Sequence, residues 1–162
     1  MLTTVDGEII SVNTTSYKIR YRFHPFADNQ FLALDLNADG SLIATGNHNG
    51  NITLFSDETQ QVVRDLRRYG QGGGVGHQNR VFGLKFQPDD RNVIVSGGRD
   101  GQVIFWDIRE PRSLFSFDSH RICGDALDIR DNKLLVASDE PSQGVRVYDI
   151  GKRELWKQVK HV

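Results

Sequence analysis

Three side chains in this sequence carry the groups of a serine hydrolase. His77 would act as the general base, Ser96 as the nucleophile and Asp100 as the carboxylate that orients the histidine. An acyl-transfer enzyme is therefore one hypothesis for the chain. Ser96, however, lies in the run NVIVSGG, which predicts a strand and not the exposed strand-to-helix turn of a G-x-S-x-G nucleophile. No segment for an oxyanion hole can be identified either, so the residues favour a structural role over catalysis.

The other reactive residue types predict neither a cofactor nor a metal. The glycines between Arg68 and Arg80 match no phosphate-binding spacing and precede no predicted helix, which favours an inserted flexible loop. The 5 histidines and the single cysteine, Cys123, lack the H-x-x-x-H and C-x-x-C spacings of zinc sites. We therefore expect no cofactor and no metal.

Composition excludes several classes of function. The chain has 162 residues, and its 20 basic and 21 acidic side chains leave a net charge of −1, which disfavours a general nucleic-acid binder. No apolar run approaches the length of a membrane-spanning helix, so we expect no membrane role. A lone cysteine and a start without a secretory pattern predict the cytoplasm or the nucleus.

One phrase occurs four times along the chain. It reads DGEIISVNT, NGNITLFSD, DGQVIFWDI and QGVRVYDI, and its glycines are Gly7, Gly50, Gly101 and Gly144. The steps between these glycines are 43, 51 and 43 residues. The longer step contains the glycine-rich insertion, which a surface loop tolerates because lengthening a loop costs little entropy. A period of this length indicates repeated structural units.

Each period contains four short segments rich in β-branched and aromatic residues and bounded by turn residues, which predicts strands. In the clearest example, VFGLKFQ is expected to place Phe82, Leu84 and Phe86 on one face, and NVIVSGG, QVIFWDI and SLFSF follow it. No helical apolar stripe of useful length appears, so the predicted fold class is all-β.

Four strands about every 43 residues, with GH near the start of a unit and WD at the end of its third strand, resemble the WD-repeat β-propellers. The match is fullest where Gly76-His77 and Trp106-Asp107 both occur. Phe55-Ser56 and Tyr148-Asp149 stand in the WD place of the neighbouring units. The histidines at positions 24, 77, 120 and 161 also recur at intervals of 53, 43 and 41.

The resemblance implies blades of four antiparallel strands in an open or partial propeller of about three and a half blades. We expect one partial WD-repeat domain over 1–162, divided into an outer half-blade at 1–24, blades at 25–68, 81–119 and 120–160, and a glycine-rich loop at 69–80. Such a propeller leaves strand edges unpaired, which predicts self-association across them. A fragment of a longer protein is the favoured explanation for the missing blades.

The resemblance also implies roles for individual residues. His77, Ser96, Asp100 and Trp106 would form a hydrogen-bonded structural tetrad inside one blade. The loops on one face of a propeller would bring together Arg80, Arg99 and Arg121 beside the turn at Asn47 to Asn49, as anchors for an acidic or phosphorylated peptide.

The function implied by the family is that of a noncatalytic protein-interaction scaffold or adaptor, although propellers as a fold also host enzymes. Asp107 and Arg109 match the W-D-x-R pattern of propellers that bind the adaptor of a cullin-type ubiquitin ligase. A substrate receptor of such a ligase is therefore the first alternative, and the serine hydrolase is a distant one. Other proteins or peptides are the expected partners.

Overall fold

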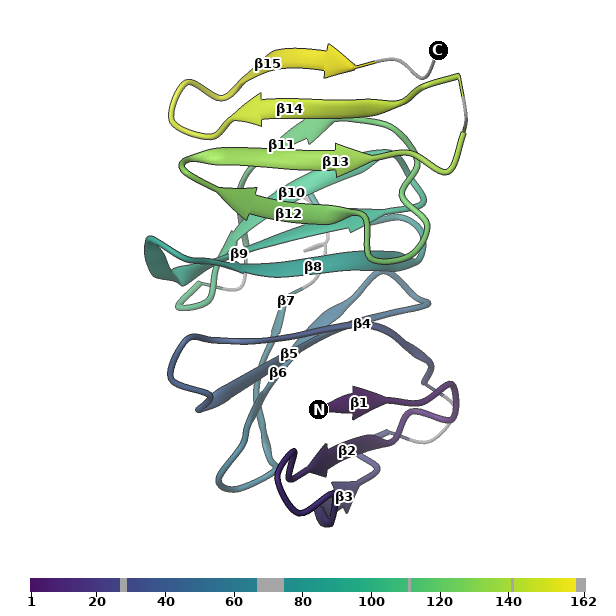
Figure 1. The fold of residues 1–162 in the computed structure, drawn as a ribbon, viewed down its shortest axis with the longest axis vertical. Helices are drawn as coiled ribbons and strands as arrows, with labels where there is room; N and C mark the ends of the chain where they lie inside the picture. Colours follow the sequence, from purple (N-terminus) through teal and green to yellow (C-terminus); the bar gives the residue numbers. More distant parts are fainter. Residues whose placement is uncertain (27–28, 67–74, 111, 141, 160–162) are drawn as a thin grey trace.

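The computed structural model describes residues 1–26, 29–66, 75–110, 112–140 and 142–159. Strands joined by turns make up the regular structure of these residues, and they form four antiparallel sheets in chain order (Figure 1). The all-β prediction is therefore confirmed.

The sheets follow one another along the sequence, and each is a meander in which consecutive strands pair. The first sheet contains β1 (Leu2–Thr3), β2 (Ile9–Val12) and β3 (Ile19–Phe23). The second contains β4 (Phe31–Leu36), β5 (Leu42–Asn47), β6 (Ile52–Ser56) and β7 (Val62–Leu66). The third contains β8 (Val81–Gln87), β9 (Asp90–Gly98), β10 (Gln102–Asp107) and β11 (Ser113–Asp118). The fourth contains β12 (Leu127–Arg130), β13 (Lys133–Ala137), β14 (Val145–Asp149) and β15 (Glu154–Val159).

The first sheet differs from the two-stranded half-blade expected from the sequence. Leu2 pairs with Ile10 and Thr3 with Ile9, so a two-residue strand precedes the first copy of the repeated phrase. The segment is too short to show an alternating pattern, so this strand could not be predicted from the sequence.

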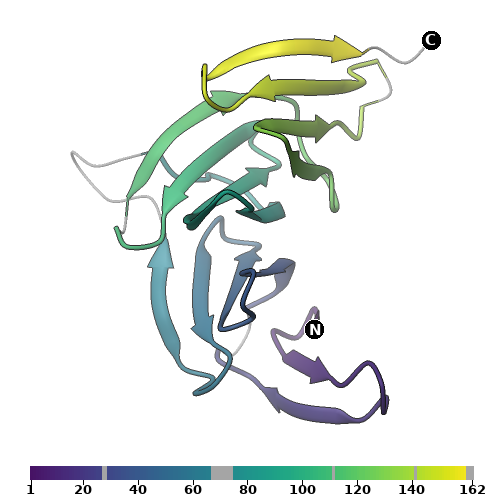
Figure 2. The same cartoon turned by 60° about the vertical axis from the view of Figure 1, so that its left-hand side comes forward.

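The four sheets are arranged around an arc, and none of them closes on itself (Figure 2). The first strand of each four-stranded sheet lies on the inner side of the arc, and the fourth strand lies on the outer side (Figure 2). The loops between the sheets therefore return from the outer rim to the inner strand of the next sheet.

Three hydrophobic clusters fill the spaces between neighbouring sheets. Ile9, Phe31 and Phe55 belong to the cluster between the first and second sheets. Trp106 is fully buried in the cluster between the second and third sheets. Tyr148 belongs to the cluster between the third and fourth sheets. Burial of apolar area between the faces of successive sheets is therefore what holds the arc together.

The four glycines of the repeated phrase share one backbone conformation. Gly7, Gly50, Gly101 and Gly144 have φ values of +80°, +84°, +76° and +67°. A positive φ is costly for residues that carry a Cβ atom, and tight turns that need it favour glycine. Gly50, Gly101 and Gly144 lie in the turns just before the third strands of their sheets, and Gly7 lies in the turn just before β2. The repeated phrase therefore marks a turn as well as a strand.

The predicted face of β8 is only partly right. The pairing with β9 shifts register between Val81 and Gly83. Leu84 and Phe86 lie in the cluster that faces the second sheet, whereas Phe82 packs against the cluster that faces the fourth. A bulge inserts an extra residue and reverses the alternation of side chains before it, so Phe82 lies on the opposite face.

Candidate functional site

The His77, Ser96, Asp100 and Trp106 side chains are joined by hydrogen bonds in the third sheet. His77 Nδ1 lies 3.0 Å from Asp100 Oδ1, and His77 Nε2 lies 2.8 Å from Ser96 Oγ. The indole Nε1–H of Trp106 donates to the same Ser96 Oγ over 2.8 Å. The cluster links the segment before β8 to β9, to the β9–β10 turn and to β10.

The chemistry of the groups gives this chain of bonds a direction. An indole N–H can only donate and a carboxylate can only accept, so Trp106 donates to Ser96 and His77 Nδ1–H donates to Asp100. In a neutral imidazole the remaining nitrogen is an acceptor, and the Ser96 hydroxyl therefore donates to His77 Nε2. Asp100 also accepts from the backbone N–H groups of Gln78 at 2.7 Å and Gln102 at 3.1 Å. Every buried polar atom of the cluster thus has a partner.

In a catalytic serine triad the serine likewise donates to the histidine and the histidine to the aspartate. The solvent exposure of the serine, however, is different here. The Ser96 side chain has no solvent exposure, and the His77 side chain is also 0% exposed. Trp106 Nε1–H donates to Ser96 Oγ, so it engages the oxygen that would have to attack a substrate. A nucleophile must reach a bound carbonyl group, and this hydroxyl is enclosed.

Gly98 makes room for the cluster. A Cβ atom at this position would lie 2.6 Å from Asp100 Oδ1 and 2.6 Å from His77 Nδ1. Such contacts are far shorter than ordinary van der Waals distances, so only glycine fits without displacing the two side chains.

Among the residues that the structure describes, the second and fourth sheets lack the same polar cluster. In the second sheet Phe26 packs on Phe55, with ring centroids 6.1 Å apart, where Phe55 holds the place of Trp106. In the fourth sheet Tyr148 replaces the tryptophan and donates to the Asp118 carbonyl over 3.1 Å. His120 is buried there, and its Nε2 has no hydrogen-bond partner among the described residues.

Neither His120 nor His24 is part of such a cluster. Burial, followed by the charge of Arg146, lowers the pKa of His120. His24 is exposed, and its Nε2 contacts the Asp6 carbonyl. His161 lies outside the described residues. Regular spacing therefore marks equivalent positions in the repeat without preserving their hydrogen bonds.

Arg80, Arg99 and Arg121 are brought to one end of the third and fourth sheets. The Arg99 amide donates to the Arg80 carbonyl over 2.9 Å, and the Ile122 amide donates to the Gly98 carbonyl over 3.2 Å. All three arginines are exposed, and within the described part of the chain none of them forms an ion pair. Three cationic side chains are therefore available at adjacent positions.

The turn at Asn47 to Asn49 is held by its own first side chain. Asn47 is buried, and its Oδ1 accepts from the amides of Asn49 at 2.9 Å and Asn51 at 3.0 Å. This is the local hydrogen bonding by which asparagine stabilises turns. The Asn47 carboxamide oxygen is therefore engaged in stabilising the turn.

Asp107 and Arg109 lie at the opposite end of the third sheet and bind each other. Arg109 Nε donates to Asp107 Oδ1 over 2.9 Å, and Arg109 Nη2 donates to Asp107 Oδ2 over 2.6 Å. The hydrogen bond from Arg109 lowers the pKa of Asp107. The Arg109 side chain nevertheless remains 66% exposed, against 11% for Asp107. The aspartate thus fixes the direction of an accessible guanidinium group.

Other parts of the structure bear on the remaining predictions. The described residues contain no group of three or more His, Cys, Asp or Glu side chains placed to hold a metal ion. Within the same residues, no helix is long and apolar enough to cross a membrane. Residues 67–74, which include the first half of the glycine-rich loop predicted at 69–80, lie outside the described part of the chain.

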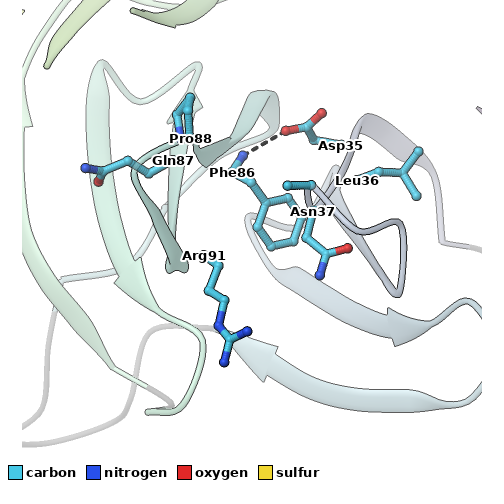
Figure 3. Close-up of a pocket in the computed structure, with 8 residues that line it drawn as sticks. Asp35, Leu36, Asn37, Phe86, Gln87, Pro88 and Arg91 are labelled. Carbon is cyan, nitrogen blue, oxygen red and sulfur yellow. Dashed lines mark hydrogen bonds between the residues drawn. The ribbon is translucent and has the colours of Figure 1, made fainter. Parts of the chain in front are cut away.

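A pocket that the sequence did not predict lies between the second and third sheets (Figure 3). Its volume is about 220 Å³, and it is lined by Asp35, Leu36, Asn37, Ala38, Phe86, Gln87, Pro88 and Arg91. The lining comes from the ends of β4 and β8, from the turns that follow them and, through Arg91, from the start of β9. The only signal in the sequence was Asp35, a carboxylate within the apolar strand FLALDL.

Comparison with known proteins agrees with the architecture. A family model described as "WD domain, G-beta repeat" matches residues 71–107. The APC/C activator protein CDH1 of Saccharomyces cerevisiae is 30% identical over 125 residues, which cover 75% of this chain and 20% of that protein. The cell division cycle protein cdt2 of Schizosaccharomyces pombe is 34% identical over 82 residues, which cover 51% of this chain and 16% of that protein.

The solved structure of U3-55K superposes with a TM-score of 0.74 at 20% identity, covering 94% of this chain and 46% of that one. At this level of identity the likeness concerns the fold alone. This chain spans a fifth or less of the length of the two curated relatives. The family match, the relatives and the four successive antiparallel sheets agree, and the chain therefore belongs to the WD-repeat family, with its sheets forming blades of a partial β-propeller.

Proposed function

We propose that this chain is a noncatalytic protein-interaction scaffold or adaptor that binds an acidic or phosphorylated peptide through Arg80, Arg99 and Arg121. The observation that carries the proposal is that these three exposed arginines share one end of two adjoining blades and lack ion-pair partners among the described residues. Residues 1–162 would act as one partial WD-repeat domain, with the blade boundaries expected above.

Arginine suits this role because its planar guanidinium group donates two parallel hydrogen bonds to a carboxylate or phosphate. Backbone hydrogen bonds join Arg99 to Arg80, and Ile122, which follows Arg121, to Gly98, so little backbone ordering is needed on binding. Three neighbouring cations on a propeller face would thus select an anionic segment of a partner.

A comparison of two triple alanine variants tests this proposal. The first removes Arg80, Arg99 and Arg121. The second removes Arg22, Arg130 and Lys152, whose exposed side chains lie elsewhere, so both variants lose the same formal charge. In calorimetric titrations of each variant with a library of phosphorylated and acidic peptides, only the first should lose binding. Equal losses in both variants would mean that net charge, and not this site, binds the peptides.

A ubiquitin-ligase receptor is the second candidate. The Asp107 carboxylate holds the exposed Arg109 guanidinium in a two-point contact, which presents it in a fixed direction. Such a pair would dock on the adaptor of a cullin-type ligase. We expect an Arg109→Ala variant to lose the adaptor in a pull-down while it keeps the binding of acidic peptides.

The distant alternative of a serine hydrolase is disfavoured by the burial of Ser96 and by its contact with Trp106. We further propose that the protein works in the cytoplasm or the nucleus. Its proposed partners are other proteins or peptides, and nucleic acid and membranes are disfavoured as partners.

Self-association across the open blade edges is also part of the proposal. Trp156 and Val159 on the outer strand of the fourth blade are 59% and 51% exposed. An exposed strand with large apolar side chains favours pairing with another chain. Light scattering at high concentration should therefore show associated species. A monodisperse monomer would contradict the claim that the edges need a partner.

A further inference from the structure

The pocket between the second and third blades lies at the end of β8 opposite to the proposed arginine site. Arg80 precedes the first residue of β8, whereas Phe86 and Gln87 at its last residues line the pocket. In Figure 3 the ring of Phe86 lies near the centre, and Asp35 approaches from the neighbouring strand. The pocket is therefore separate from the arginine site, and it lies at the same end of the third sheet as Asp107 and Arg109.

The carboxylate of Asp35 is a partly buried charge that lines this pocket. Asp35 is partly buried, and its Oδ2 accepts the amide proton of Phe86 over 2.7 Å. Among the described residues no cation lies within ion-pair distance of it. The charge of Lys85 acts on the Asp35 carboxylate from a distance, but Lys85 Nζ forms its ion pair with Asp125 at 3.8 Å. Burial accordingly raises the pKa of Asp35.

The walls of the pocket are mainly apolar. Leu36, Ala38, Phe86 and Pro88 supply carbon surface around the entrance to Asp35. An apolar guest would leave the carboxylate dehydrated without a partner, which costs free energy. An anionic guest would be repelled. A guest with an apolar stem and a cationic end satisfies both parts of the lining.

The surrounding charges agree with a cationic guest. Asp39 and Asp89 are exposed in the turns after β4 and β8, and Asp90 is exposed at the start of β9. Arg91 also lines it, but Figure 3 shows its guanidinium group pointing away from the Asp35 carboxylate. Arg91 therefore does not neutralise the Asp35 carboxylate, and a cationic guest can do so.

The geometry of Asp35 favours an ammonium over a guanidinium group. One carboxylate oxygen already accepts from the Phe86 amide, which works against the fork of two parallel bonds that arginine prefers. A lysine ammonium is a compact charge that needs only the other oxygen.

We propose that this pocket binds a lysine side chain presented by an extended segment of a partner protein. The stem packs against Phe86 and Leu36, and the ammonium group pairs with Asp35. The site goes beyond the proposed function because it occupies the other end of the blades and selects the opposite charge.

Amide chemical shifts provide the test. The probe is the acetylated and amidated peptide Gly-Lys-Gly, titrated into the isotope-labelled full chain, because the Phe86 amide donates directly to Asp35 and reports on it. We expect saturable shifts of the Phe86 amide in the millimolar range, and binding about tenfold weaker when the lysine is Nε-acetylated or replaced by norleucine. Equal binding of the three peptides, or no saturable shift at Phe86, would overturn the proposal.

Two kinds of variant distinguish the contribution of the Asp35 charge from that of the pocket volume. Asp35→Asn should abolish the preference for lysine, whereas the matched variant Asp39→Asn, at an exposed acid beside the pocket, should keep it. Ala38→Trp should fill the pocket from an exposed turn while Asp35 stays in place, and it should block binding even if Asp35→Asn fails to fold. Unchanged lysine binding in Ala38→Trp would contradict the assignment of the pocket.

Discussion

Replacing His77 by alanine should lower the free energy of unfolding by about 1–3 kcal/mol. The substitution leaves the Ser96 hydroxyl with only the Ile104 carbonyl, 3.4 Å away, as an acceptor. Asp100 keeps its two backbone N–H donors but loses the side-chain donor. The Ser96 hydroxyl is therefore left with one long hydrogen bond, and the Asp100 carboxylate loses one of its donors. The expected loss of stability accordingly lies within the range for a broken buried hydrogen bond.

Urea unfolding followed by far-ultraviolet circular dichroism measures this loss. His24→Ala is the matched control, because His24 recurs at a similar spacing in the repeat but is exposed. The control should differ from wild type by less than about 0.5 kcal/mol. If the unfolding curve of His77→Ala superposes on that of wild type, the tetrad contributes nothing to stability and the structural interpretation is wrong.

Acid should reduce the difference between wild type and His77→Ala. Burial would raise the pKa of Asp100, but the hydrogen bond from His77 and those from two backbone amides hold it below its ordinary value. A carboxyl group with a lowered folded-state pKa contributes stability that is complete above its unfolded pKa of about 3.9 and is lost as the pH falls through the folded pKa. The two proteins should therefore differ more at pH 7 than below about pH 3. A constant difference across this range would contradict the assigned contact.

Three further predictions concern the same region. Gly98→Ala should destabilise the protein by about 1–3 kcal/mol in urea unfolding, because the added Cβ would lie 2.6 Å from His77 Nδ1; a neutral effect would contradict the close packing. Gly97→Ala should have an effect of similar size, because its Cβ would lie 2.2 Å from Ile122 Cδ1 in the next blade, and a fully native melting curve would count against blade-to-blade contact there. A fluorophosphonate probe for active serines should leave Ser96 unlabelled in mass spectrometry, since the hydroxyl is enclosed; stoichiometric labelling would revive the hydrolase hypothesis.

The fold was largely predictable because its signals are local and repeated. Gly50 and Gly101 mark turns that require a positive φ, and the alternating apolar residues between such turns mark strands. The strands of the three four-stranded blades accordingly fall close to the segments read from the sequence.

Features that depend on a partner strand were not predictable. The bulge that moves Phe82 to the other face is defined by its register with β9, and the pairing of Leu2 depends on β2. Local patterns contain no information about which residue of a distant strand lies opposite.

The candidate sites divide in the same way. The contacts of His77 fall at positions that the family resemblance specifies, so they could be named in advance. The two-point pairing of Arg109 with Asp107 and the contact between Asp35 and the Phe86 amide, 51 residues apart, required coordinates. The direction of a side chain and the contact of residues far apart in the chain depend on tertiary structure, and they cannot be predicted from a single sequence.

The most direct test of the scaffold proposal is affinity purification from native cells followed by mass spectrometry. Wild type would be compared with Arg109→Ala and with the Arg80, Arg99 and Arg121 triple alanine variant. The proposal predicts that a set of partner proteins is lost only in the triple variant, and loss of a cullin-ligase adaptor only in Arg109→Ala would identify the receptor function instead. If all three proteins recover the same partners, binding does not depend on the arginine site, and the central claim is wrong.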